Sequence, residues 1–220
     1  MFVPLVLSHP ESRILMRTLL LSAVVAAVSI GSAVADDLAP YVDPSLHAIE
    51  PEGELSSLPE ETRQLVGDLS ASAKSTAELF EKMTKEQLDF RPPDESHTPR
   101  WNAEHLAGAQ ILFFSKYFHS LDDRLPVVEQ MPKQSPEDYE PWHPEWDGAE
   151  EAGWIREADA YVRRYAYLLK DVDLDAPVQD GVLPPFFKTP RSLLKGLAGH
   201  WSEHTANVQK KFSTDGWPNE

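Results

Sequence analysis

Two histidines near the C-terminus, His200 and His204, have the spacing of a metal site. They lie four residues apart in a segment whose apolar residues repeat at helical spacing. Residues four apart share one face of a helix, with about 5 to 6 Å between their Cβ atoms, so both imidazoles can reach one ion. The alternative is a pair of core histidines that hydrogen bonds satisfy, since a buried imidazole without a partner is costly.

A third ligand is expected from His105, in the segment that begins at Thr98. At 1.5 Å per residue, His105 lies about 10 Å from the start of its helix, and His204 and His200 lie about 12 and 18 Å from the end of theirs. These heights agree if the two helices are antiparallel. Glu104 or His119 as the third donor is an alternative, and so is a bundle without metal.

Three neutral imidazoles would leave a coordination position for water or a substrate atom, as in catalytic zinc sites. The ion would lower the pKa of a bound water or thiol, or polarise a carbonyl group. The chain has no cysteine, so a thiol would have to arrive on the substrate. Glu203 is the candidate base or orienting residue, and its alternative role is a solvated position on the helix surface.

The letters from His200 to His204 also match the H-x-x-E-H pattern of inverted zinc peptidases. Those enzymes need a further ligand, normally a glutamate well downstream on another helix. The one glutamate that follows His204 is Glu220, at the terminus. The sequence therefore disfavours a peptidase.

Four segments carry the helical period, and they predict an all-α fold, a four-helix bundle. Thr98-Pro99 and Thr189-Pro190 are typical helix starts, and Ser57 to Glu60 has capping-box spacing. The proline-rich stretch between helices two and three is long enough to run the length of a bundle, so these helices are expected to be parallel. The expected helices span about 59–83, 98–121, 149–169 and 189–212.

The N-terminus predicts export. Arg17, an apolar run from Leu19 to Ile30 and small residues before Asp36 together resemble a secretory signal peptide. The expected organisation is a signal peptide over 1–35, a proline-rich lead-in over 36–58, the bundle over 59–213 and a tail over 214–220. The apolar run is short for a membrane span, so no stable anchor is expected after cleavage. The net charge of −16 argues against a nucleic-acid partner.

Three motifs resemble the DinB-like (damage-inducible) family of metalloenzymes: Phe90–Pro93 (FRPP), Trp101–Ala107 (WNAEHLA) and the His200–His204 pair. The resemblance implies an up-down-down-up bundle with a three-histidine site for zinc, nickel or a similar divalent ion. It also implies a metal-dependent hydrolase or thiol-dependent transferase, acting on a small molecule, and homodimers in many members. In many members the second-helix ligand occupies the position of Gly108, so His105 would have to replace it.

A different class of function is a non-catalytic binding or structural bundle. Its contact surface would be the loop Pro141–Trp146 (PWHPEW), whose tryptophans lie among prolines. Such aromatics can form recognition sites or fold back over a bundle end. His97, in another loop, is expected to be solvated.

Overall fold

A computed structural model describes residues 44–47 and 49–219, which fall within the compact unit Tyr41–Glu220. The expected signal peptide and most of the lead-in lie outside the described residues. Four long helices dominate: α2 (Glu60–Phe80), α4 (Pro99–Leu121), α5 (Gly148–Tyr165) and α6 (Pro190–Lys211). The short elements are α3 (Lys85–Leu88), η1 (Pro44–His47), η2 (Leu55–Ser57) and η3 (Ala166–Leu169).

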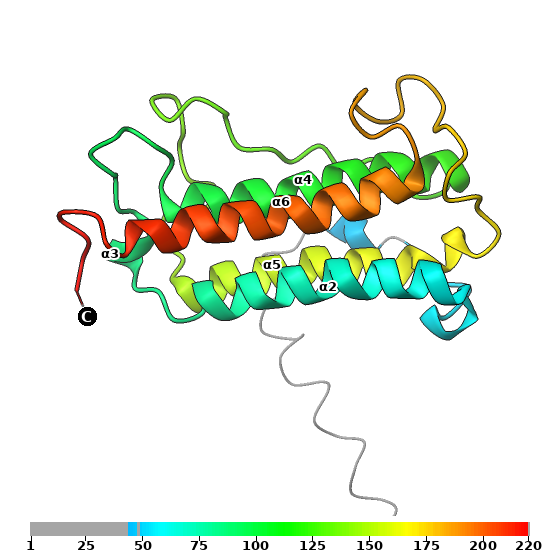
Figure 1. Ribbon diagram of the computed structural model, residues 1–220, viewed down its shortest axis with the longest axis horizontal. Coiled ribbons are helices and arrows are strands. Elements are labelled where there is room, and N and C mark those ends of the chain that lie inside the picture. The colour runs from blue at the N-terminus through cyan, green and yellow to red at the C-terminus, as the bar shows by residue number, and fades with distance from the viewer. Residues whose placement is uncertain (1–43, 48, 220) are drawn as a thin grey trace, which may run out of the picture. The chain divides into compact units, whose positions relative to one another are not determined.

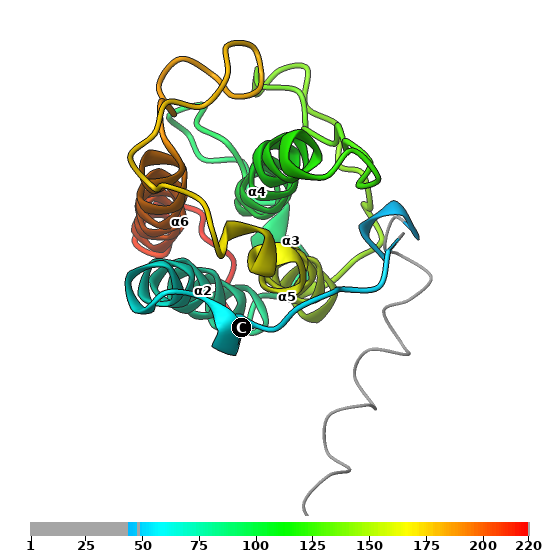
Figure 2. The ribbon, with the colours of Figure 1, turned by 90° about the vertical axis from the view of Figure 1, so that its right-hand side faces the viewer.

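The four long helices form a bundle in which each packs against two others (Figure 2). Seen end-on, the order around the bundle is α2, α5, α4 and α6. The all-α four-helix class expected from the sequence is confirmed. The apolar core, including the fully buried Phe114, Tyr161 and Trp201, fills the space between these helices.

Contacts between helices show the direction of each. Glu61 pairs with Arg191 and Thr76 bonds Thr205, so α2 and α6 are parallel. Across the bundle, Arg100 pairs with Glu151 near the start of both helices, and Gln110 donates to the carbonyl of Ala158 further along. This makes α4 and α5 parallel. The chain therefore runs up-down-down-up (Figure 1), and α6 runs antiparallel to α4.

Parallel α4 and α5 explain the long connection over residues 122–147, which must return along the length of α4. It lies against that helix: the Trp101 indole donates to the carbonyl of Lys133 at 2.8 Å, and Ser115 Oγ accepts from the backbone of Val128 at 3.0 Å. With α5, α6 and this connection around it, α4 is buried on most of its surface, as its apolar composition predicted.

Local sequence sets most helix ends. Thr98 and Thr189 cap α4 and α6 by accepting hydrogen bonds from the N–H groups of Trp101 and Ser192, so both predicted starts are confirmed. The capping box predicted for Ser57 is wrong. Pro59 is the N-cap of α2, and Ser57 ends η2 and donates instead to the carbonyl of Glu54.

The third predicted helix also ends earlier than expected. Its α-helical part stops at Tyr165, and the η3 turn carries the chain on to Leu169. At its start, Asp147 and Glu150 form a reciprocal capping box. None of the helices in the described part of the chain has the length and apolar character needed to cross a bilayer.

Candidate metal centre

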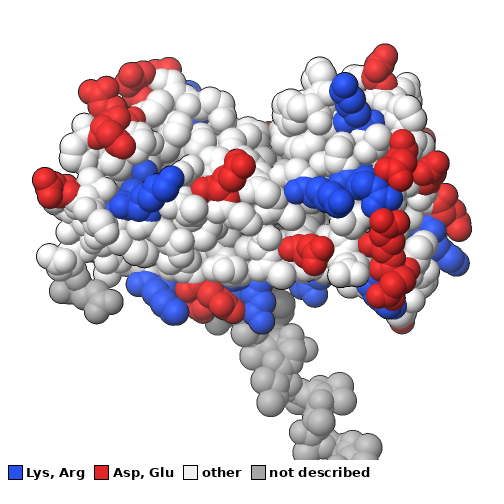
Figure 3. All heavy atoms as spheres, in the orientation of Figure 1, with Lys and Arg blue, Asp and Glu red and all other residues white. Residues whose placement is uncertain are grey.

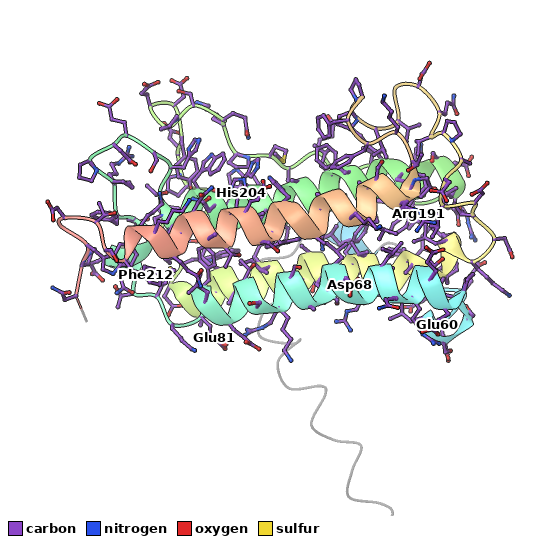
Figure 4. All side chains as sticks on the ribbon, viewed as in Figure 1. Glu60, Asp68, Glu81, Arg191, His204 and Phe212 are labelled. Carbon is purple, nitrogen blue, oxygen red and sulfur yellow. The ribbon has the colours of Figure 1, made fainter. Side chains whose placement is uncertain are left out.

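His105 of α4 and His200 and His204 of α6 come together between these two helices. One potential ligand atom from each lies within 4.8 Å of the others, and Nε2 of His105 is 3.1 Å from Nε2 of His200. Figure 4 labels His204 on the side of α6 that adjoins α4. Zinc–nitrogen bonds are about 2.0–2.1 Å long, so a small adjustment of the rings lets the three donors fit one ion.

The orientation of His204 is fixed by its neighbour Asn102. Nδ1 of His204 lies 2.7 Å from Oδ1 of Asn102. The amide of Asn102 cannot turn round, because its Nδ2 donates to the carbonyl of Thr98 at 2.7 Å. Nδ1 of His204 therefore carries the proton and donates it, and the lone pair on Nε2 is free. Metal-binding histidines use this arrangement almost always.

A stack of three rings positions His105. Its imidazole lies parallel to the indole of Trp101, with centroids 4.3 Å apart, and His97 stacks on the other side of that indole at 3.5 Å. Nδ1 of His105 is buried and makes no hydrogen bond. The His105 ring is therefore held by stacking and by the contact of its Nε2 with His200, whereas that of His204 is held by the hydrogen bond to Asn102.

Burial keeps all three imidazoles neutral at neutral pH. It lowers the pKa of His105 to about 3 and that of His204 to about 4, and repulsion from neighbouring histidines adds to both shifts. Burial lowers the pKa of His200 as well. Neutral imidazole is the form that binds metal, so these lone pairs are available without the loss of a proton.

The alternative donors expected from the sequence, Glu104 and His119, bind other groups in the structure. Glu104 is buried and accepts from Tyr139 Oη and from the backbone of Trp142, both at 2.9 Å, so it anchors the connection over 122–147. Nδ1 of His119 lies 2.7 Å from the carbonyl oxygen of Leu125. Neither residue belongs to the metal-capable group found among the described residues.

Gly108, the position of the ligand in many DinB-like proteins, faces the same connection. A Cβ at this position would lie 2.4 Å from the carbonyl oxygen of Gln130, and 3.3 Å from the indole of Trp142. A side chain here would push the connection off α4. In this chain the histidine on α4 that meets the pair on α6 is His105, one turn earlier.

Glu203 is exposed on the surface of α6, three residues from His200, whose pKa it raises slightly against the effect of burial. Its role as base or orienting residue stays a prediction.

His97, expected to be solvated, is in fact half-buried on Trp101. The expectation was wrong because the loop before α4 folds over the start of that helix.

A cleft of about 420 Å³ opens beside His204. His204, Asn102, Trp101 and His97 line it on the histidine side. His204 is the one member of the three-histidine group in this lining, so a small molecule in the cleft would approach the group through His204.

A comparison with protein families matches residues 68–207 to the DinB superfamily. The chain belongs to the DinB superfamily. The matched range includes α4 and all three histidines. No significant match was found among curated proteins or among solved structures. The family and the three-histidine group agree with the expected metal-binding character, without specifying the ion.

Proposed function

We propose that this DinB protein binds one divalent ion, zinc or nickel, through His105, His200 and His204, and that it is a metal-dependent hydrolase or thiol-dependent transferase. The observation that carries the proposal is the hydrogen bond from His204 to Asn102. It leaves Nε2 of His204 free, in the same group as the facing Nε2 atoms of His105 and His200.

When bound, the ion would supply a Lewis acid that activates a water molecule or a substrate thiol. The chain would supply the rest of the site. Three neutral imidazoles leave a position for the substrate, Asn102 orients His204, and the cleft admits a small molecule. The buried face of Trp101 excludes water behind His105.

The open position can be tested with cobalt(II) as a coloured substitute for the native ion. A small thiol added to the cobalt-loaded protein should produce a thiolate-to-cobalt charge-transfer absorption, because sulfur binds at the vacant position. A cobalt site that is filled yet unchanged by thiol would contradict a catalytic centre and favour a structural one.

Glu203 serves in this proposal as the base. Glu203→Gln should keep the metal content and lower turnover once a substrate is identified, because the amide cannot accept the proton. An unchanged rate would return Glu203 to an ordinary surface role, which its exposure supports.

The competing view, a binding bundle with Pro141–Trp146 as its contact surface, finds less support. Trp146 is only 3% exposed and belongs to the core, and Trp142 is partly buried over Gly108. These aromatics fold back onto the bundle. This burial favours the metal-dependent function over a recognition surface at this loop.

We also propose that the protein is exported and cleaved before Asp36, on the sequence of its N-terminus. The N-terminal sequence of protein recovered from the exported fraction tests this, and retention of the uncleaved chain in the cytoplasm would contradict it. The acidic charge makes nucleic acid an unsuitable partner, and a homodimer stays a prediction from the family resemblance.

A further inference from the structure

Two lysines lie in the wall of the cleft beside His204. His204 and Asn102 line one side, and Lys210 and Lys211, in the last turn of α6, line another, with the carboxylate of Asp94 also in the wall. On the face shown in Figure 3, acidic residues gather at both ends of the bundle. The cleft therefore brings two lysines close to the candidate metal centre of a strongly acidic protein.

Lys211 is buried, with 7% of its surface exposed, which is unusual for lysine. Its ammonium donates to Ser96 Oγ at 2.8 Å. Among the described residues, no carboxylate oxygen lies close enough to Nζ of Lys211 to form an ion pair with it. Asp94 attracts it at longer range, and burial lowers its pKa. An ammonium has three donors, so this one has spare hydrogen-bonding capacity at the wall of a cleft.

The position at a helix end does not account for this burial. Lysines in the last turn of a helix are favoured by the partial negative charge there, and an exposed lysine such as Lys210 satisfies that preference. Burying the charge of Lys211 without a close anion costs free energy. A ligand anion in the cleft would offset that cost.

We propose that the Lys211 ammonium binds a terminal anionic group, such as a carboxylate, of a substrate whose other end reaches the metal. This inference rests on the proposed metal-dependent function. Lys211 follows His204 by seven residues on one helix, which separates them by about 10 Å along the axis. The substrate class is therefore a small elongated molecule with an anionic group roughly 10 Å from the atom that reacts at the metal.

Two thiols that differ only at the far end test this inference on the cobalt-loaded full chain. 8-Mercaptooctanoate carries a carboxylate at about the required separation, and 8-mercaptooctanol is its neutral counterpart. Binding is followed by the thiolate-to-cobalt absorption. The carboxylate compound should bind about tenfold more tightly or better, the size expected for a charge-assisted hydrogen bond.

Lys211→Met should remove this preference and leave the affinity for the neutral thiol unchanged. Lys195→Met is the matched control, because Lys195 is exposed near the other end of α6 and should not affect either thiol. Equal binding of the two thiols by the wild type would overturn the inference, whether or not the Lys211 variant folds. A preference that survives in Lys211→Met would overturn it too.

The same titration separates this inference from the proposed function. Absence of the absorption with both thiols would overturn the open metal site and, with it, the anion subsite. A normal absorption with both thiols and no preference for the carboxylate would overturn the subsite alone.

Discussion

The hydrogen bond between Asn102 and His204 gives a quantitative test of how the site is built. Asn102→Ala removes the acceptor of the His204 Nδ1 proton and also the donor to the carbonyl of Thr98. Both bonds are 2.7 Å long, and Asn102 is 3% exposed, so water does not readily replace them. The His204 ring would then be free to turn or to change tautomer.

The expected effect is a loss of metal affinity of about 10 to 100-fold, the range for removing an outer-shell partner of a histidine ligand. This corresponds to about 1.4 to 2.7 kcal/mol. Asn102→Asp keeps an oxygen acceptor for Nδ1 and adds a negative charge near the ion. It should therefore retain metal affinity better than the alanine variant.

Metal affinity is measured by competition with a chromophoric chelator, and thermal unfolding of the metal-free proteins shows whether each variant folds. Asn207→Ala is the control, since Asn207 is an exposed asparagine on α6, nearly one turn beyond His204. A folded Asn102→Ala protein with wild-type affinity would refute the argument that this bond prepares His204 for metal.

Three further predictions concern stability. Gly108→Ala should lower the free energy of unfolding by about 1 to 3 kcal/mol, because its Cβ would strike the carbonyl of Gln130. Gly199→Ala, with open space around it, should raise the free energy of unfolding by up to about 1 kcal/mol. Denaturant titration measures both, and a stabilised Gly108→Ala protein would contradict the packing described. Burial raises the pKa of Glu104 to about 7, so ionisation of this carboxyl lowers the free energy of unfolding as the pH rises from about 4.5 to 7. In denaturation at pH 5 and pH 8, the free energy of unfolding of Glu104→Gln should rise relative to that of the wild type by at most about 3 kcal/mol at the higher pH. A relative rise at the lower pH instead would contradict this direction. A divalent ion at 100 times its dissociation constant should stabilise the fold by about 2.7 kcal/mol, and a melting temperature insensitive to metal and to chelator would contradict binding to the folded state.

Regular features of the chain were predictable from sequence. The Thr-Pro starts of α4 and α6 carry their own capping groups, so their positions could be predicted locally. The four-residue spacing of His200 and His204 places them on one face, and the helix lengths gave His105 a matching height. The direction of the helices followed from the length of the connection between α4 and α5.

Irregular features were not predictable, because they depend on where loops come to rest. The contact of Gln130 with Gly108 and the stacking of His97 on Trp101 join loops to α4 without any sequence period. The acceptor role of Asn102 requires the known positions of two antiparallel helices. Even so, a polar residue at 102, three before His105 and so on the same side of a helix, was a usable signal.

The central claim is that one ion binds to all three histidines, and metal content tests it most directly. The untagged protein, expressed with zinc and nickel supplied, should contain one ion per chain. His105→Ala, His200→Ala and His204→Ala should each lose it, and His119→Ala, which changes a histidine outside the group, should retain it. Full metal content in the His105 variant, or none in the folded wild type, would contradict the account.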